Sequence, residues 1–308
     1  MAQVTPALVK QLREQSGAGM MDCKKALEEN GGDIEAATDW LRKKGLAAAA
    51  KKAGRVAAEG LIGLALEGPK GVLVEVNSET DFVARNETFQ SLVREVTALA
   101  LSAEGDVEKL KTLTIPSSGL PVEQAAQQAI GVIGENITVR RTSYLAVQEG
   151  VVAGYMHSQA APGLGKIGVL VALQSKGDPA RLAEVGKQIA MHVAAANPQA
   201  LDIASIDPTL VDRERAIFAD QAKASGKPDN IVEKMVEGRI RKFYEEAVLL
   251  EQVFVVDTDK RVKQVVEAAA KELGTPVALV GFIRLALGEG LAKEEQDLAS
   301  EVAKLTQG

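Results

Sequence analysis

Histidine, the side chain most often used for acid–base and metal chemistry near neutral pH, occurs at only two positions in this sequence. His157 and His192 are far apart, and neither has a cysteine or a second histidine beside it. A zinc site usually takes three or four protein ligands, so neither histidine indicates one. We expect His192 to be a satisfied or partly exposed helix residue. His157, just past a strand end, is expected to belong to a contact surface, and no nucleophile, base and orienting group can be assembled around the adjacent Ser158.

The single cysteine and the glycine-rich loops are equally poor candidates for chemistry. Cys23 has no second cysteine to pair with, so an internal disulfide is excluded, as suits a reducing cytosol. On an expected helix, a small packed residue is favoured over a reactive thiol. The segment 163–167 lacks the spacing and the hydroxyl of a Walker loop, and the glycines at 17 and 19 follow a helix instead of a strand. We therefore expect no catalytic residue, no cofactor, no bound metal and no enzyme.

Composition and charge limit the kinds of partner that this chain is expected to bind. The chain has 308 residues, 46% hydrophobic and 25% charged, as in an ordinary protein of one large domain or two to three small ones. A net charge of -6 makes it a poor binder of phosphate backbones, so no direct nucleic-acid ligand is expected. No apolar run reaches the roughly 18 residues of a membrane span, and no targeting segment is visible. These features predict a cytoplasmic protein with no membrane partner.

One loop stands out by its position between two expected elements. Asn77 to Asn86 lies between an expected strand and an expected helix, a position where binding residues are often placed. Thr80 or Asp81 can cap the helix, and Phe82 can be a core residue. Taken alone, the Asp-Phe pair favours that structural interpretation.

The elements that position this loop begin with three short helices. Thr5 can cap the first, the second runs from about 22 to 29, and Asp33 can cap the third. The segment from Lys43 to Gly54 is predicted to be a helical linker, with little to bury beyond its alanines and Leu46. Residues 1 to about 54 therefore predict a small bundle with a linker.

From about residue 55 a strand–strand–helix unit occurs twice. Segments 60–66 and 71–76 are typical of a hairpin, and an amphipathic helix follows. Segments 149–155 and 167–173 and their helix repeat this order. Because short Glu-Gly and Gly-Val-Leu-Val sequences recur in both copies, we predict two related α+β halves.

The last third of the chain is predicted to be mostly helical. Residues 208–247 indicate a helical hairpin around a turn at 225–228. Val253–Val256 is strand-like, a helix follows it, and Val277–Leu287 is strand-like again. A final helix carries an apolar stripe, able to pack on a partner or on the chain's own core, of Leu298, Val302 and Leu305.

Six segments combine into a specific resemblance. The first is Thr80-Asp81-Phe82-Val83-Ala84. The others, in order and spread over nearly the whole chain, are Gly17–Leu27, Ile133–Ile137 with Arg140 and Arg141, Ala190–Ala194, Lys234–Arg239, and Gly281–Arg284 with Gly288–Gly290. Together these segments resemble the signatures of the elongation factor Ts family, the exchange factors of elongation factor Tu.

The resemblance implies an α+β fold of four parts. Residues 1–54 would form a ubiquitin-associated-like three-helix bundle, and residues 55–145 the first half of a two-part core. Residues 146–280 would form the second half, with the helical hairpin at about 208–247 inserted as a coiled coil. Residues 281–308 would form a C-terminal strand and helix module.

The function implied is nucleotide exchange without covalent chemistry. A member of this family binds elongation factor Tu in its GDP-bound and nucleotide-free states. It promotes GDP release by disturbing the magnesium and phosphate site, and GTP then rebinds. Family members also self-associate, so a homodimer or a two-plus-two complex with the partner stays open.

The resemblance assigns roles to particular residues. Phe82 would be an apolar wedge beside the partner's magnesium site, and Asp81 a polar group that rearranges the magnesium-supporting residues. Thr80 and Val83 would hold this loop.

Further contacts implied by the resemblance lie outside the loop. Met20 and Met21 would dock the partner's nucleotide domain, since methionine suits an adaptable contact, although we expect one of the two to be bundle core. Ile133 and Gly134 would form a second core contact, and His157 would join the contact surface. An alternative function is an adaptor that binds a ubiquitin-like protein through the N-terminal bundle.

Overall fold

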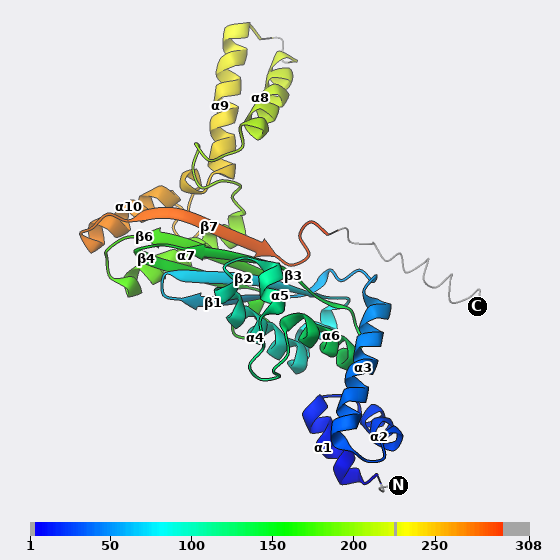
Figure 1. Cartoon of the computed structure of the whole chain (residues 1–308). Coiled ribbons are helices and arrows are strands. Elements are labelled where there is room, and N and C mark those ends of the chain that lie inside the picture. The colour runs from blue at the N-terminus through cyan, green and yellow to red at the C-terminus, as the bar shows by residue number, and fades with distance from the viewer. Residues whose placement is uncertain (1–3, 225–226, 292–308) are drawn as a thin grey trace.

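Long antiparallel strands form two sheets in the middle of the molecule, and helices lie outside them (Figure 1). The computed structural model describes residues 4–224 and 227–291. It confirms the predicted α+β class. Within the described residues, no helix combines the length and the apolar character that crossing a bilayer requires. The predicted final helix with Leu298 lies outside the described residues.

Three helices form the N-terminal bundle: α1 (Pro6–Ser16), α2 (Met20–Glu29) and α3 (Ile34–Lys52). The Thr5 hydroxyl accepts a hydrogen bond from the Leu8 amide, as its predicted capping role requires. The bundle core is small and apolar, and consists of Val9, Leu12, Cys23, Ala26, Leu27 and Ala37. Cys23 is fully buried, which confirms the prediction of a packed residue.

The prediction that the linker segment is helical is confirmed, and this helix is the second half of α3. Lys43 and Gly54 do not flank a separate element, because α3 is continuous from Ile34 to Lys52. Its buried positions Gly45 and Ala49 pack toward the body of the molecule. Little burial was predicted here because small residues have little apolar area. Their small size nevertheless allows α3 to approach α6 closely.

The first sheet has the strand order β3-β2-β1-β5. Its members are β1 (Glu59–Glu67), β2 (Lys70–Ser78), β3 (Ile137–Ala146) and β5 (Leu164–Gly165). β1 and β2 form the predicted hairpin, closed between Glu67 and Lys70. Three helices cover the outer face of this sheet, namely α4 (Glu87–Ala103), α5 (Val107–Thr112) and α6 (Val122–Ile133).

The second sheet has the order β4-β6-β7, from β4 (Gly150–His157), β6 (Ile167–Gln174) and β7 (Ala278–Ala286). The predicted second strand pair is confirmed as β4 and β6. In both sheets a third strand returns beside the second strand of the pair, β3 on β2 and β7 on β6. The outer face is covered by α7 (Pro179–Ala196) and α10 (Val262–Leu273).

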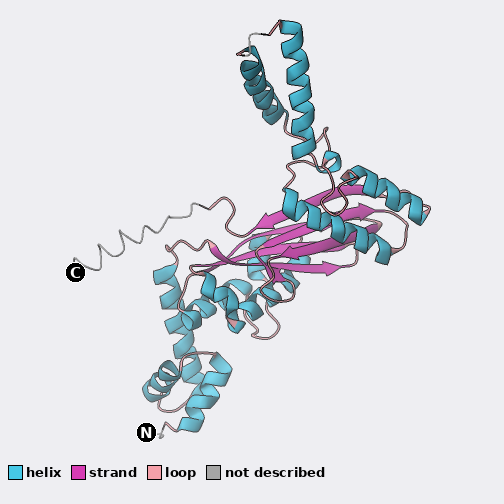
Figure 2. Cartoon of the chain, turned by 180° about the vertical axis from the view of Figure 1, so that it is seen from behind, coloured by secondary structure: helices cyan, strands magenta, loops and turns pink. Residues whose placement is uncertain are grey.

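The two sheets pack against each other, so the order of layers is helices, sheet, sheet, helices (Figure 2). Along β2, Val72 and Val74 face the helices, whereas Leu73 faces the second sheet. Along β6, Val171 faces α7, whereas Leu170 faces the first sheet. Because both faces of these strands are buried, their sequences are continuous apolar runs without the polar alternation of half-exposed strands.

A buried carboxylate fastens the end of β7 to the first sheet. Glu75 in β2 is fully buried, and Arg140 Nη1 donates to it at 3.0 Å. Arg141 also donates to Glu75 and, through Nη2, to the Ala286 carbonyl oxygen at 3.0 Å. The Gly288 amide donates to Glu75 Oε1 at 2.8 Å. The carboxylate therefore joins two strands of the first sheet to the segment that follows β7.

The predicted helical hairpin consists of α8 (Pro208–Lys223) and α9 (Asp229–Ala247), and projects from the opposite end of the molecule to the bundle (Figure 1). It has its own apolar cluster, which includes Val211, Val236 and Ile240. A short 3-10 turn, η2 (Leu249–Glu251), leads back to the core.

His192 lies at the base of this hairpin and is fully buried. Its Nε2 lies 2.8 Å from Gln252 Oε1, and its Nδ1 accepts from the Val255 amide at 3.2 Å. The prediction of a satisfied helix residue is thus confirmed, and that of partial exposure is wrong. Burial lowers the pKa of His192, against a smaller opposing effect of the Gln252 hydrogen bond.

The prediction of a strand at Val253–Val256 is wrong. Val253 makes one isolated bridge to Arg261, and Val255 and Val256 lie in a turn. Phe254 is buried against His192, with ring centroids 5.7 Å apart. β-Branched residues favour strands only where a neighbouring strand is available to pair with, and here one buried aromatic anchors a loop instead.

Candidate functional site

The predicted wedge loop connects β2 to α4 through a short 3-10 helix, η1 (Asp81–Arg85). Phe82 is 78% exposed, the most exposed large apolar side chain among the described residues. Asp81 is also exposed, and its carboxylate has no hydrogen-bond or ion-pair partner in the part of the chain that the structure describes. Val83 and Ala84 are buried in the core beneath the first sheet. The loop therefore turns two adjacent residues outward and the next two inward.

The end of this loop is fixed by the start of α4. The Asn86 side chain caps α4 by accepting from the Phe89 amide at 3.1 Å. Gln90 Nε2 donates to the Ala84 carbonyl oxygen at 2.8 Å. Phe89 itself is fully buried. Phe82 is exposed although its neighbours on both sides are anchored, so its position is set by the fold.

The beginning of the loop is held by a carboxylate from a distant segment. Glu135 accepts from the Thr80 amide at 2.9 Å and from the Thr80 hydroxyl at 2.6 Å. In return, Glu79 accepts from the Asn136 amide at 2.6 Å. Segments 79–83 and 133–136, both singled out from the sequence, thus clamp one another through reciprocal charge-assisted hydrogen bonds.

A third segment, the end of α3, completes this clamp. Lys52 Nζ donates to the Gly134 carbonyl oxygen, and the Arg55 carbonyl oxygen accepts from Asn136 Nδ2 at 2.8 Å. Arg55 also forms an ion pair with Glu79 at 3.3 Å. We call the contacts among Lys52, Arg55, Glu79, Thr80 and 134–136 the loop clamp.

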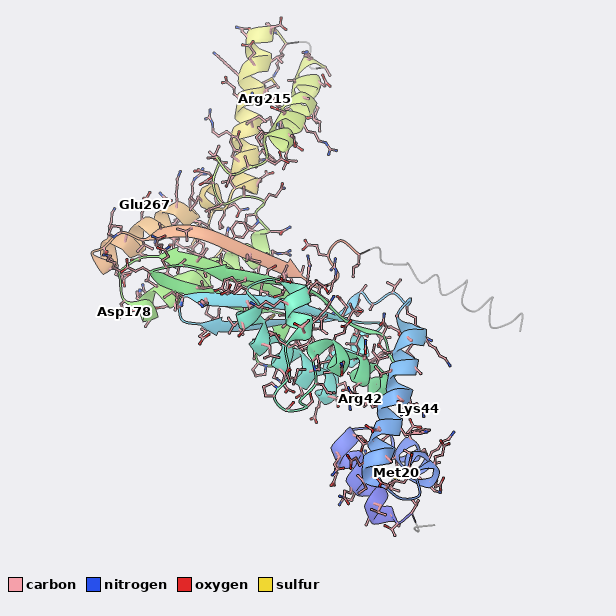
Figure 3. All side chains as sticks on the ribbon, viewed as in Figure 1. Met20, Arg42, Lys44, Asp178, Arg215 and Glu267 are labelled. Carbon is pink, nitrogen blue, oxygen red and sulfur yellow. The ribbon has the colours of Figure 1, made fainter. Side chains whose placement is uncertain are left out.

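The remaining predicted contact residues lie at three separate places. Met20 and Met21, at the start of α2, are 60% and 74% exposed, so the expectation that one is bundle core is wrong. Both lie in the first turn of α2 and line a groove of the bundle with Val9 and Lys24. Figure 3 labels Met20 on this bundle. They do not contact the wedge loop.

Ile133 and Gly134 end α6 inside the loop clamp. Ile133 is half-buried against the core of the first sheet. Gly134 has a φ of 87°, in the left-handed region that terminates helices, and its amide bonds the Ile130 carbonyl oxygen. This helix end aims Glu135 at Thr80.

His157 is exposed at the end of β4, and its Nδ1 lies 3.3 Å from the Tyr155 hydroxyl. The loop that follows returns to the first sheet, where Leu164 is buried in the same core cluster as Val83. That loop therefore reaches the core below η1. Among the described residues, His157 itself makes no contact with Phe82.

Sequence reasoning missed the polar residues that hold the wedge. Glu135 lies inside a signature segment and Glu79 directly precedes another, but nothing in a single sequence shows that these two segments bond each other. Lys52 was assigned to the helical linker, and Arg55, at the start of the predicted core, was given no role. One sequence feature could have indicated these contacts. Charged and amide side chains gather where α3, β2 and α6 end, whereas the middles of these elements are mainly apolar.

Comparison with known proteins shows to which family the chain belongs. The profile of the family described as Elongation factor TS matches residues 79–289. The chain is 62% identical over 305 residues to elongation factor Ts of Rhodospirillum centenum, covering 99% of both proteins. It is 60% identical over 308 residues to elongation factor Ts of Parvibaculum lavamentivorans, covering 100% of both. The chain belongs to the elongation factor Ts family. Membership confirms the resemblance carried by residues 80–84 and associates the chain with translation elongation.

For a member of the elongation factor Ts family, the loop clamp has a testable structural role. Glu135→Ala removes both acceptors of Thr80, and we expect the free energy of unfolding to fall by about 1–3 kcal/mol because a half-buried amide loses its partner. Hydrogen–deuterium exchange should show faster uptake in the peptide covering 79–83. Glu123→Ala, on an exposed position of α6, is the matched control and should leave that peptide unchanged. Equal uptake in both variants would contradict the clamp.

Proposed function

We propose that this chain binds elongation factor Tu in its GDP-bound state and promotes GDP release, so that GTP rebinds. The observation that carries the proposal is the exposure of Phe82, 78%, on a loop anchored at both ends. A large aromatic held out of its own fold loses little conformational entropy on binding and gains the full benefit of burial in a partner.

The thermodynamic requirement is differential binding. An exchange factor must bind the nucleotide-free state of its partner better than the nucleotide-bound state. By linkage, it weakens the nucleotide by the same factor by which the nucleotide weakens it. A thousandfold loss of GDP affinity requires about 4 kcal/mol of differential contact. One buried aromatic and a few charge-assisted hydrogen bonds supply that amount.

The residues divide this work according to their surroundings. Phe82 is proposed as the apolar wedge beside the partner's magnesium site. Asp81, whose carboxylate has no partner among the described residues, is proposed as the group that rearranges the magnesium-supporting residues. Thr80 and Val83 hold the loop, one through Glu135 and one through the core.

Further contacts are proposed at a distance from the wedge. Met20 and Met21 offer exposed, adaptable apolar surface for the partner's nucleotide domain. Ile133 and Gly134 contribute at the loop clamp, and His157 at the exposed end of β4. No covalent step is needed, and the proposed compartment is the cytoplasm, where translation factors act.

The test is release of fluorescent GDP from elongation factor Tu, followed by stopped flow with and without this chain. We expect the release rate to rise with the concentration of the chain and to saturate. We also expect added magnesium to reduce the effect, because the ion stabilises the phosphate site that the wedge disturbs. A release rate that does not depend on the chain would overturn the proposal.

A further inference from the structure

Two of the proposed contact regions lie at opposite ends of one helix. α3 begins in the bundle that carries Met20 and Met21, and ends in the loop clamp that holds Thr80 (Figure 3). It has 19 residues, a length of about 28 Å at the usual helical rise. The spacing between the methionine surface and the wedge therefore depends on how α3 is attached at each end.

At the bundle end the attachment is both apolar and ionic. Ala37 is fully buried in the bundle core. Lys44 Nζ forms an ion pair with Asp22 of α2 at 2.6 Å, and lies 5.5 Å from the centre of the Trp40 ring. Asp22 follows Met21 directly in sequence, so this ion pair joins the first turn of α2 to the middle of α3.

At Gly45, α3 crosses α6 at Gly131 with no side chain between the two backbones. A Cβ built on Gly131 would lie 2.8 Å from the Cα of Gly45, a distance that real Cβ contacts essentially never reach. A Cβ built on Gly45 would meet the Cα of Gly131 at 3.9 Å, an ordinary contact. Gly131 is therefore the position at which any side chain must push the helices apart.

Polar contacts flank this crossing on both sides. Arg42 Nη2 donates to Gln124 Oε1 at 2.6 Å on the bundle side. Lys52 Nζ donates to the Gly134 carbonyl oxygen on the side of the loop clamp. The two helices are thus fastened before, at and after the glycine pair, and we call these contacts the α3–α6 joint.

We propose that the α3–α6 joint is a positioning device for nucleotide exchange: it fixes the distance and angle between the Met20–Met21 surface and the Phe82 wedge, so that docking of the bundle places the wedge. The inference rests on the proposed function. It goes further in assigning a role to Gly131, which need not touch the partner. A rigid connection makes the second contact effectively intramolecular, whereas a displaced one forbids both contacts at once.

The joint can be displaced by a single methyl group. In Gly131→Ala the new Cβ must move α3 away from α6, while alanine itself favours the helical backbone. Gly238→Ala is the matched control, because Gly238 is also helical, lies on α9 and has no atom within 4 Å of its built Cβ. A cooperative thermal unfolding transition in each variant would show that it is folded.

The decisive measurement is the maximal rate of stimulated GDP release in a double-mutant cycle with Phe82→Ala. We expect Gly131→Ala to lower that rate by about tenfold when Phe82 is present, since small misplacements of a working group are costly. In the Phe82→Ala background we expect less than about a twofold effect, because the joint then has no wedge to place. A merely structural role would give the same loss in both backgrounds.

A second variant keeps the test decisive if Gly131→Ala does not fold. Gln124→Ala removes only the Arg42 hydrogen bond at a half-buried position, and should lower the maximal rate by about threefold with Phe82 present and not without it. Gly131→Ala behaving like Gly238→Ala, or equal losses in both backgrounds, would overturn the positioning role. Absence of stimulated release by the unmodified chain would instead reject the proposed function.

Discussion

Truncation of Phe82 to alanine is expected to reduce stimulated GDP release from elongation factor Tu by about thirtyfold, the effect of losing a binding hot spot of about 2 kcal/mol. The stability of the chain should stay within about 0.5 kcal/mol, because the side chain is 78% exposed and packs little in the free protein. Exchange is measured by stopped-flow fluorescence of labelled GDP, and stability by urea denaturation.

The matched control for this substitution is Val256→Ala. Val256 is an exposed apolar residue, 52% exposed, in the turn after η2 and outside the wedge loop. Its truncation should change neither exchange nor stability. If Phe82→Ala unfolded the chain, Phe82 would be a structural residue; if it left exchange intact, the wedge would be wrong. A thirtyfold loss of stimulated GDP release in Phe82→Ala, with stability unchanged and no loss in Val256→Ala, would show that Phe82 acts in binding the partner.

Replacement of Glu75 by glutamine is expected to cost about 3 kcal/mol of stability, the largest effect on folding of the changes considered. The substitution keeps the shape but removes the charge that faces Arg140 and Arg141 in a buried site. The guanidinium groups would then lie beside a neutral amide. Denaturant unfolding measures the loss, and Glu67→Gln, at an exposed strand end, should cost almost nothing.

The same residue predicts a dependence on pH. Burial alone raises the pKa of Glu75, but hydrogen bonds from the Gly288 amide, Asn77, Arg141 and Arg140 outweigh it and lower the pKa below the ordinary value of 4.5. The folded state thus holds fewer protons on this carboxyl than the unfolded state, so its contribution is complete above pH 4.5 and is lost as the pH falls through the lowered value. Below pH 4.5 the unmodified chain should lose stability more steeply than Glu75→Gln, and parallel curves would contradict this.

The parts of the fold that followed from the sequence are those with strong local patterns. The hairpin of β1 and β2 has two apolar runs around a glycine–proline turn, and Thr5 caps α1 as its type predicts. The strand β3 was not predicted, although 137–146 is rich in β-branched residues, because its two arginines interrupt the apolar pattern. Those arginines point to a buried partner, Glu75, which only the folded chain identifies.

Several features of the candidate site could not be predicted from a single sequence. Residues 80–84 were found by resemblance, but whether Phe82 is core or surface depends on the neighbours that compete for the core. Val83 and Phe89 occupy that space, and Phe82 is left outside. The partner of Thr80 lies 55 residues further along the chain, so the contact is invisible to any local pattern. Gly131 has no functional group, and the role proposed for it comes from its contact with Gly45 of α3.

The central claim, that the chain favours the nucleotide-free state of its partner, is tested most directly by comparing two affinities. Isothermal titration calorimetry would measure binding of the chain to elongation factor Tu with GDP bound and with nucleotide removed. The proposed mechanism predicts that the nucleotide-free form binds about a thousandfold more tightly, and that GDP affinity falls by the same factor when the chain is bound. Equal affinity for the two forms would contradict it.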